Sequence, residues 1–212
     1  MYMFVEPSEL TLFDAGMRNR NGGKVVFEAI EQIGRKITDL SRILITHADI
    51  DHYGNLADIA EKSGATVYAG EETAQFMNSG QYPDHLSKFQ MWLLNNFVRS
   101  TPYPEGKVQR LKDGDVLPML GGTQVLATPG HTPEHFSFFN PQTGVCIVGD
   151  TLHSRQGKLG LNPKGITADM IAVKQSAIRL LELSPTVFAC GHGEPKSNHS
   201  IDEIQTLFAQ LK

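Results

Sequence analysis

The stretch ILITHADIDHYG, Ile43–Gly54, decides how this sequence is interpreted. A short β-branched run leads directly into four side chains of the types that bind metals: His47, Asp49, Asp51 and His52. If the strand continues through the first of them, the period-two alternation of strands turns the first three to one side. A turn at residues 51–54 then brings the fourth round as well. Because buried carboxylates and imidazoles need partners, four of them at one loop predict more than one metal ion.

Three later stretches repeat this arrangement. Each of QVLATPGH, GVCIVGD and TVFACGH is an apolar strand that ends at a glycine, followed by a ligand-type residue. These residues are His131, Asp150 and His192. The glycine leaves room beside the side chain that follows it. If all four strand ends share one edge of a pair of sheets, seven ligand-type side chains converge there.

Turn signals divide the rest of the chain into short segments. Strands are predicted at residues 2–6, 10–14, 42–46, 65–69, 116–120, 123–127, 135–139, 145–148 and 186–189. Helical spacing predicts helices at residues 25–33, 56–64 and 168–183, and Ser200 with Glu203 forms a capping-box pattern before a last helix. Helices between some strands, with a run of strands in the middle, favour two sheets with helices outside over one parallel sheet.

The order of these motifs resembles that of the metallo-β-lactamase-fold hydrolase superfamily. The signature of that family is His-x-His-x-Asp-His, followed downstream by a His, an Asp and a final His. Here HADIDH, residues 47–52, is a variant His-x-Asp-x-Asp-His pattern, because Asp49 stands where the second His usually stands. LFDAG, residues 12–16, is similar to an early strand–Asp–x–Gly element of the family, which implies that Asp14 lies near the site beside the ligands.

The resemblance covers nearly the whole chain and implies an α+β fold. This fold is an αββα sandwich of two mixed β-sheets with helices on the outer faces. It implies a single metallo-β-lactamase-like domain over residues 1–212, and we predict a helical insert at residues 71–105. The chain begins only a few residues before the part that matches the family's second strand.

The resemblance also implies a ligand set for two divalent metal ions. One ion receives His47, Asp49 and His131, the other receives Asp51, His52 and His192, and Asp150 bridges them. Histidine with aspartate suits zinc, although an oxygen ligand at Asp49 makes iron or manganese acceptable. Asp49 has a second interpretation, as an acceptor that orients a ligand.

A hydroxide held between two metal ions is a strong nucleophile at neutral pH. Asp51 is the predicted catalytic residue, because it could orient this nucleophile or pass its proton to the leaving group. The predicted function is a dinuclear metal-dependent hydrolase of an ester-like bond, which is a thioester, lactone, amide or phosphoester. Hydroxyacylglutathione hydrolases usually carry an extra helical region after the last His, so that activity is less expected here.

Two other classes of protein stay open. Flavodiiron oxidoreductases carry a carboxylate at the position of Asp49, so the chain could be a diiron oxidoreductase that lacks its flavin domain. A metal-binding relative without catalysis is the second alternative. Metal analysis and an optical spectrum distinguish a colourless zinc hydrolase from an oxo-bridged diiron protein.

Composition and charge limit the expected binding partners and the expected cellular compartment of the protein. The formal net charge is −4 and there is no basic block, which argues against nucleic acid and anionic membranes as partners. MYMFVEPSEL lacks a basic region followed by an apolar core, so we expect no signal peptide. Cys146 and Cys190 are expected to be reduced and buried, which favours the cytoplasm. The expected partner is a small-molecule substrate, and a homodimer is compatible with the sequence.

Some side chains leave their roles open. Tyr82, Phe89, Trp92 and Phe97 fit a lid over a substrate pocket as well as a packing face on the sheet or on another subunit. Of the remaining histidines, His85 and His199 are expected at the surface. His135 is expected to be packed or solvated more readily than to hold a pocket hydrogen bond.

Overall fold

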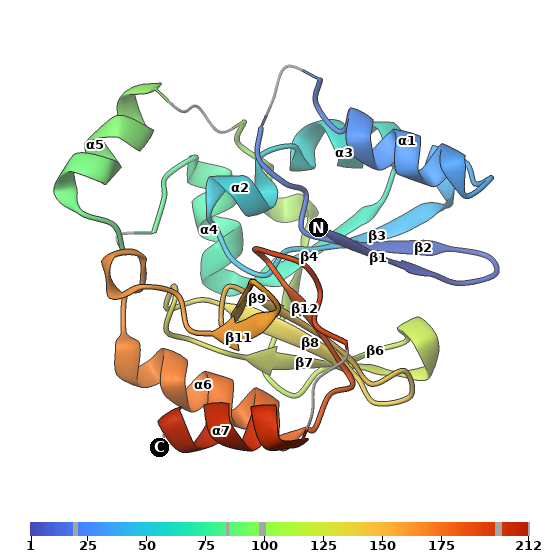
Figure 1. Ribbon diagram of the computed structural model, residues 1–212. Coiled ribbons are helices and arrows are strands. Elements are labelled where there is room, and N and C mark those ends of the chain that lie inside the picture. The colour runs from blue at the N-terminus through green and yellow to red at the C-terminus, as the bar shows by residue number, and fades with distance from the viewer. Residues whose placement is uncertain (19–20, 84, 98–100, 198–200, 212) are drawn as a thin grey trace. The chain divides into compact units, whose positions relative to one another are not determined.

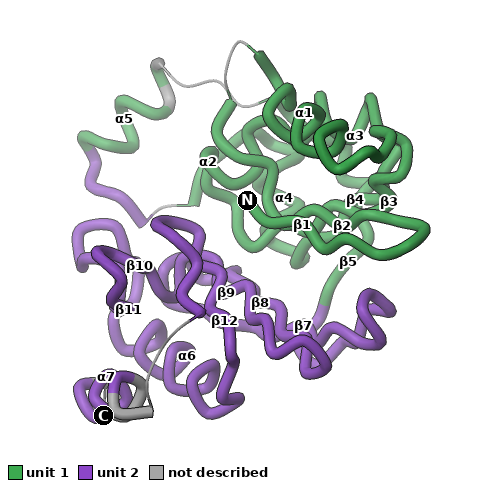
Figure 2. The backbone as a smooth tube through the Cα atoms, turned by 45° about the vertical axis from the view of Figure 1, so that its right-hand side comes forward, with its two compact units in different colours: residues 1–83, 89–111 green, residues 84–88, 112–212 purple. Residues whose placement is uncertain are grey.

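The structure is a computed structural model that describes residues 1–18, 21–83, 85–97, 101–197 and 201–211. The chain forms two compact units (Figure 2). The first unit comprises residues 1–83 and 89–111, and the second comprises residues 84–88 and 112–212. Each unit contains one mixed five-stranded sheet, as the α+β prediction requires. The single domain over residues 1–212 stays a prediction.

The sheet of the first unit has its strands in chain order. They are β1 (Tyr2–Val5), β2 (Leu10–Phe13), β3 (Leu40–Leu44), β4 (Thr66–Gly70) and β5 (Val108–Leu111). The first pair is antiparallel and the remaining pairs are parallel. The helices are α1 (Lys24–Gln32), η1 (Ile37–Asp39), α2 (Ile50–Tyr53), α3 (Leu56–Ser63), α4 (Glu71–Ser79), α5 (Lys88–Phe97) and η2 (Glu105–Lys107).

Helices α1 and α3 lie side by side in the first unit (Figures 1 and 2). Their apolar stripes, which include Ile30 and Ile59, belong to one buried cluster with the strand residues Ile43 and Val67. Leu44, the neighbour of Ile43, is also fully buried although it points to the opposite face. The sheet is therefore apolar on both faces, which is typical of a sheet that is covered on both sides.

The sheet of the second unit has the order β12-β9-β8-β7-β6. Its strands are β6 (Val116–Leu117), β7 (Thr123–Ala127), β8 (Phe136–Asn140), β9 (Val145–Gly149) and β12 (Val187–Cys190). A separate hairpin joins β10 (His153–Arg155) to β11 (Lys158–Gly160). The helices are η3 (Met119–Gly121), η4 (Lys164–Ile166), α6 (Met170–Glu182) and α7 (Ile201–Leu211).

Helices α6 and α7 pack together in the second unit (Figure 1). Leu180 of α6 and Leu207 of α7 share a buried cluster with Val148 and Phe188 of the sheet. Burying side chains of this size contributes about 1.5–3 kcal/mol each to folding. Within the described residues, every helix is too short or too polar to cross a membrane.

Most predicted elements are confirmed with shifted ends. The predicted strand at residues 116–120 is wrong beyond Leu117, because the chain turns into η3 with Leu120 at a φ of 48°. The short strands β5, β10 and β11 were not predicted, because VQRL, HSR and KLG show no sustained apolar alternation. Ser200, the expected cap of α7, lies outside the described residues.

The two cysteines are free and buried, which confirms that they are reduced thiols. Burial raises the pKa of both, and raises that of Cys190 to about 12. Both thiols therefore stay protonated at pH 8, and the thiol is a poor nucleophile. We expect neither to react with Ellman's reagent in the folded protein at pH 8, and both to react in guanidinium chloride. Rapid labelling of the folded protein would contradict this burial.

Candidate metal centre

The first group of metal-type donors lies between β3 and α2. The predicted continuation of the strand through His47 is wrong, because β3 ends at Leu44 and Asp51 already belongs to the short helix α2. The donors His47, Asp49, Asp51 and His52 are instead gathered by a loop and one helical turn. The rings of the two histidines lie 4.0 Å apart between their centroids.

A buried carboxylate, Asp14, orients both imidazoles of this group. Nδ1 of His52 donates to Oδ2 of Asp14 at 2.8 Å. The hydroxyl of Thr46 donates to Oδ1 of Asp14 at 3.0 Å and lies 2.9 Å from Nδ1 of His47, which donates to it. A proton on Nδ1 leaves Nε2 of each ring as the atom that can face a metal ion. A carboxylate that fixes the tautomer in this way is typical of metal-binding histidines.

Asp14 keeps its charge in this buried position. Burial acts to raise the pKa of its carboxyl, but the charges of His52 and His47 and the hydrogen bonds from His52 and Thr46 outweigh burial and lower the pKa. The carboxylate is therefore ionised at neutral pH and accepts from both sides. The resemblance of LFDAG to the family element implied a place for Asp14 beside the predicted ligands, and the structure puts its carboxylate in contact with one of these residues, His52.

The donor atoms of this group form two pairs, and within each pair the spacing is close to that of two ligands of the same ion. Nε2 of His47 lies 3.5 Å from Oδ2 of Asp49, and Nε2 of His52 lies 3.9 Å from Oδ2 of Asp51. In a tetrahedral site with bonds of roughly 2.0–2.1 Å, neighbouring ligand atoms are about 3.3 Å apart. Both pairs are close to this spacing, so the donors fit divalent ions without large rearrangement.

The second group of donors lies at one edge of the second sheet. Strands β7, β9 and β12 run in the same direction, because β8 is antiparallel to β7 and β9, and β12 is parallel to β9. Their carboxyl ends therefore share one edge, where His131, Asp150 and His192 follow. Oδ2 of Asp150 lies 3.5 Å from Nε2 of His131 and 3.2 Å from Nε2 of His192.

Asp150 is the centre of this second group. Its side chain is only 3% exposed, whereas that of His192 is 54% exposed. One carboxylate oxygen therefore lies within 3.5 Å of two imidazole nitrogens, which is close to the spacing of neighbouring ligands around a divalent ion. Because half of His192 faces solvent, this end of the group is open to a substrate.

His135 is a residue whose role sequence analysis missed. It is buried, as the packed alternative expects, but its Nε2 also accepts from the backbone N–H of Asp150 at 3.0 Å. Its Nδ1 donates to the hydroxyl of Thr128 at 2.8 Å. The short spacing between His131 and His135 was a usable signal, because the next strand, β8, begins at Phe136 and pairs with β7. His135 therefore lies near the end of β7 from which the chain leaves toward His131.

His85 is also placed differently from the surface position expected for it. It is half-buried, and its ring packs edge to face with that of His131, with the centroids 5.2 Å apart. No local pattern distinguishes this histidine, because the contact depends on the path of the chain before α5. His199 lies outside the described residues.

The aromatic residues of the helical segment do not act as one group. Tyr82 is buried, whereas Phe89 and Trp92 are 68% and 53% exposed. The two exposed rings stack with centroids 6.3 Å apart on α5. The side chain of Phe97 lies outside the described residues. Exposed stacked rings are compatible with a lid and with a subunit contact, so both interpretations stay open.

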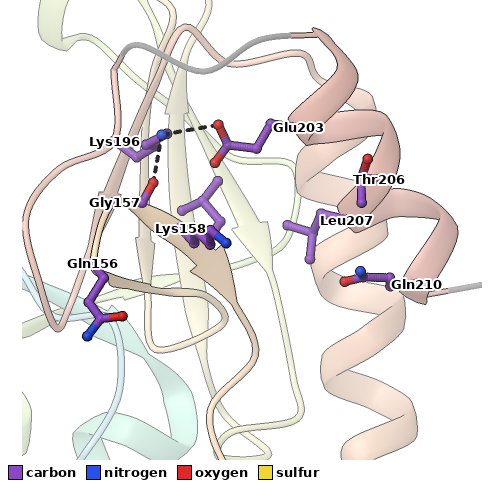
Figure 3. Close-up of a pocket in the computed structure, with 9 residues that line it drawn as sticks. Gln156, Gly157, Lys158, Lys196, Glu203, Thr206, Leu207 and Gln210 are labelled. Carbon is purple, nitrogen blue, oxygen red and sulfur yellow. Dashed lines mark hydrogen bonds and ion pairs between the residues drawn. The ribbon is translucent and has the colours of Figure 1, made fainter.

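A cavity of about 500 Å³ lies in the second unit, between the β10–β11 hairpin and α7 (Figure 3). Nζ of Lys196 joins its walls, at 2.6 Å from the carbonyl oxygen of Gly157 and 3.1 Å from Oε2 of Glu203. Its lining includes lysines and glutamines but no histidine or aspartate among the described residues. This donor set does not suit a divalent ion, so the cavity is distinct in chemistry from the metal-type groups.

Comparison with known proteins agrees with the chemistry of the two donor groups. The sequence model of the Metallo-beta-lactamase superfamily matches residues 1–192, so the chain belongs to this family. It is 29% identical to the "Probable metallo-hydrolase YflN" of Bacillus subtilis (strain 168), over 96% of this chain and 83% of that protein. It is 25% identical to the hydroxyacylglutathione hydrolase GloC of Haemophilus influenzae, over 77% of this chain and 74% of that protein.

A solved structure is also similar to this fold. The solved structure of TTHA1623 in a di-iron-bound form matches with a TM-score of 0.67 and 26% identity. That match covers 92% of this chain and 88% of the other. The predicted α+β fold of the family is confirmed. By family, the chain is a metal-dependent hydrolase.

Proposed function

We propose that the chain is a dinuclear metal-dependent hydrolase of an ester-like bond, with Asp150 as the ligand shared by two ions. The observation that carries this proposal is the position of one Asp150 carboxylate oxygen beside two imidazole nitrogens. A carboxylate oxygen in this position could bind two ions at once. The open side chain of His192 supplies an approach for the substrate.

The remaining ligands divide between the two ions. His47, Asp49 and His131 would hold one ion, and Asp51, His52 and His192 would hold the other. The spacing of His47 from Asp49, and of His52 from Asp51, supports these pairs. We propose zinc, because histidine nitrogens with carboxylate oxygens suit it.

Divalent ions held by these donors would lower the pKa of a water and polarise the oxygen of the scissile bond. The side chains of this protein supply the rest. Asp51 is part exposed, with its side chain 30% accessible, so it can accept a proton from the attacking water and deliver it to the leaving group. Asp14 holds His52 so that its ring cannot rotate during this transfer.

The proposed substrate is a small molecule with a thioester, lactone, amide or phosphoester bond. The name of one relative, a hydroxyacylglutathione hydrolase, supports a hydrolysable small molecule. The net charge of −4 and the lack of a basic block give no general attraction to polyanions.

Metal quantification on the purified protein, followed by a screen with generic thioesters, lactones and phosphodiesters, tests this function. We expect close to two ions per chain, a colourless protein and turnover of at least one class of substrate. Chelation should abolish turnover, and zinc should restore it. A protein that binds no divalent ion would contradict the proposal.

A diiron oxidoreductase is the second candidate, and two observations favour it. Asp49 places a carboxylate where the family usually has a histidine, and one solved relative is a di-iron form. This candidate predicts a coloured protein with an oxo-bridged diiron absorption band and redox turnover. A relative that binds metal without catalysis predicts uptake of ions with no turnover in the whole screen.

A further inference from the structure

The segment that follows β11 makes two contacts with the loops that carry metal-type donors. At its start, Asn162 is only 5% exposed. Its Nδ2 donates to the carbonyl oxygen of Asp150 at 3.0 Å and to Oδ2 of the same residue at 3.3 Å. One amide therefore holds the backbone and the carboxylate of Asp150 together.

The other end of this segment contacts the loop of His131. The N–H of Ala168 donates to the carbonyl oxygen of His131 at 3.0 Å, and the N–H of Asp169 donates to that of Gly130 at 2.9 Å. Asp169 also caps α6, because its Oδ1 accepts from the N–H groups of Ile171 and Ala172. The segment is thus anchored on a helix while it spans two ligand loops.

The side-chain amide of Asn162 donates a hydrogen bond to Oδ2 of Asp150, the central atom of the second donor group. Oδ2 of Asp150 is the oxygen that faces both His131 and His192. The terminal torsion of aspartate is soft, so an unrestrained carboxylate rotates between orientations. A donor fixed at 3.3 Å favours the one orientation that turns Oδ2 toward the imidazoles. An amide does not titrate, so this restraint holds at every working pH.

We propose that Asn162 is a positioning residue for the metal centre, which orients the Asp150 carboxylate before metal binds. This inference rests on the proposed function, because it concerns the ligand shared by the two ions. Ordering a ligand in advance removes part of the entropic cost of binding. Partners of ligands typically change metal affinity by about 10–100-fold when they are removed.

The test compares Asn162→Ala with the wild type by competition of each apo-protein with a chromophoric chelator. We expect metal affinity to fall at least about tenfold. We also expect the visible spectrum of the cobalt-substituted protein to change, because the geometry at Asp150 changes. A purely structural role would leave this spectrum intact.

Asn140→Ala is the matched control. Asn140 is another buried amide of the second unit, and its Nδ2 donates to carbonyl oxygens in the turn around η3. Among the described residues, the hydrogen bonds of its side chain go to Met119, Leu120, Gly122, Thr123 and Thr143, and none of these is a metal-type donor. We expect this variant to lower the melting temperature while metal affinity and the cobalt spectrum stay as in the wild type.

The possible results distinguish a failure of the positioning role from a failure of the proposed hydrolase function. If the wild type binds two ions and Asn162→Ala binds them with unchanged affinity and spectrum, the positioning role is wrong and the hydrolase proposal stands. If the wild type binds no ions, both fall. If the alanine variant does not fold, Asn162→Leu, which keeps the size but has no donor, is measured by the same criterion, and an affinity within twofold of the wild type overturns the role.

Discussion

Replacing Asp150 with alanine is expected to lower turnover by at least about 10³-fold, the scale seen when a key electrostatic group is lost from a catalytic site. Oδ2 of Asp150 faces His131 and His192, so alanine removes the oxygen that both imidazoles share. Each proposed ion loses a ligand at once, and the metal content is expected to fall to one ion or fewer per chain. Elemental analysis after gel filtration and a rate measurement on the same sample check both results.

Asp113→Ala is the control for this change. Asp113 lies in the same unit, but its side chain is 50% exposed and pairs with Arg179 at the surface. An exposed pair contributes about 0–1 kcal/mol to stability, so metal content and turnover should stay as in the wild type. Full activity with two ions in Asp150→Ala would rule out the shared-ligand role.

The second donor group could be predicted from the sequence because its signals are local. Each of His131, Asp150 and His192 comes shortly after an apolar run, and each run is a strand in the structure. What the sequence does not state is the direction of the strands. Direction follows from pairing: β7, β9 and β12 all run the same way, which brings three distant residues to one edge.

The first donor group shows why its geometry could not be predicted. The alternation argument needed a strand through His47, but the N–H of Thr46 is taken by Oδ1 of Asp14 and not by a neighbouring strand. Asp14 itself has a φ of 59°, which turns the chain out of the sheet after β2. The carboxylate of Asp14 thus takes the place of a neighbouring strand as the hydrogen-bond partner of Thr46. The alternation of apolar and polar residues in the sequence gives no sign of this change.

Asn162 and His85 were beyond sequence analysis for a different reason. Asn162 reaches back to Asp150 across the β10–β11 hairpin, whose short strands lack an apolar pattern. His85 meets His131 only because of the path of the chain before α5. Both contacts depend on the course of irregular segments, which tertiary packing decides.

Gly193→Ala is expected to have a large effect although Gly193 is not one of the proposed ligands. Gly193 has a φ of 86°, and an added Cβ would overlap the carbonyl oxygen of Ser154. Ser154 also contacts His192, because its N–H donates to the carbonyl oxygen of His192 at 3.2 Å. The overlap must therefore move either β10 or His192. Backbone strain and overpacking together should lower the free energy of unfolding by about 3 kcal/mol.

Gly114→Ala isolates the strain from the overlap, because Gly114 has the same φ of 86° and nothing lies within 4 Å of an added Cβ. We expect this control to lose about 1 kcal/mol of stability and to bind metal normally. Gly193→Ala should lose more stability and also bind the ion of His192 more weakly, since that imidazole is displaced. Melting temperatures and chelator competition on both variants measure the two effects. Equal losses of stability and equal metal affinity in the two variants would contradict this prediction. They would show that Ser154 can move at little cost and that the position of His192 does not depend on Gly193.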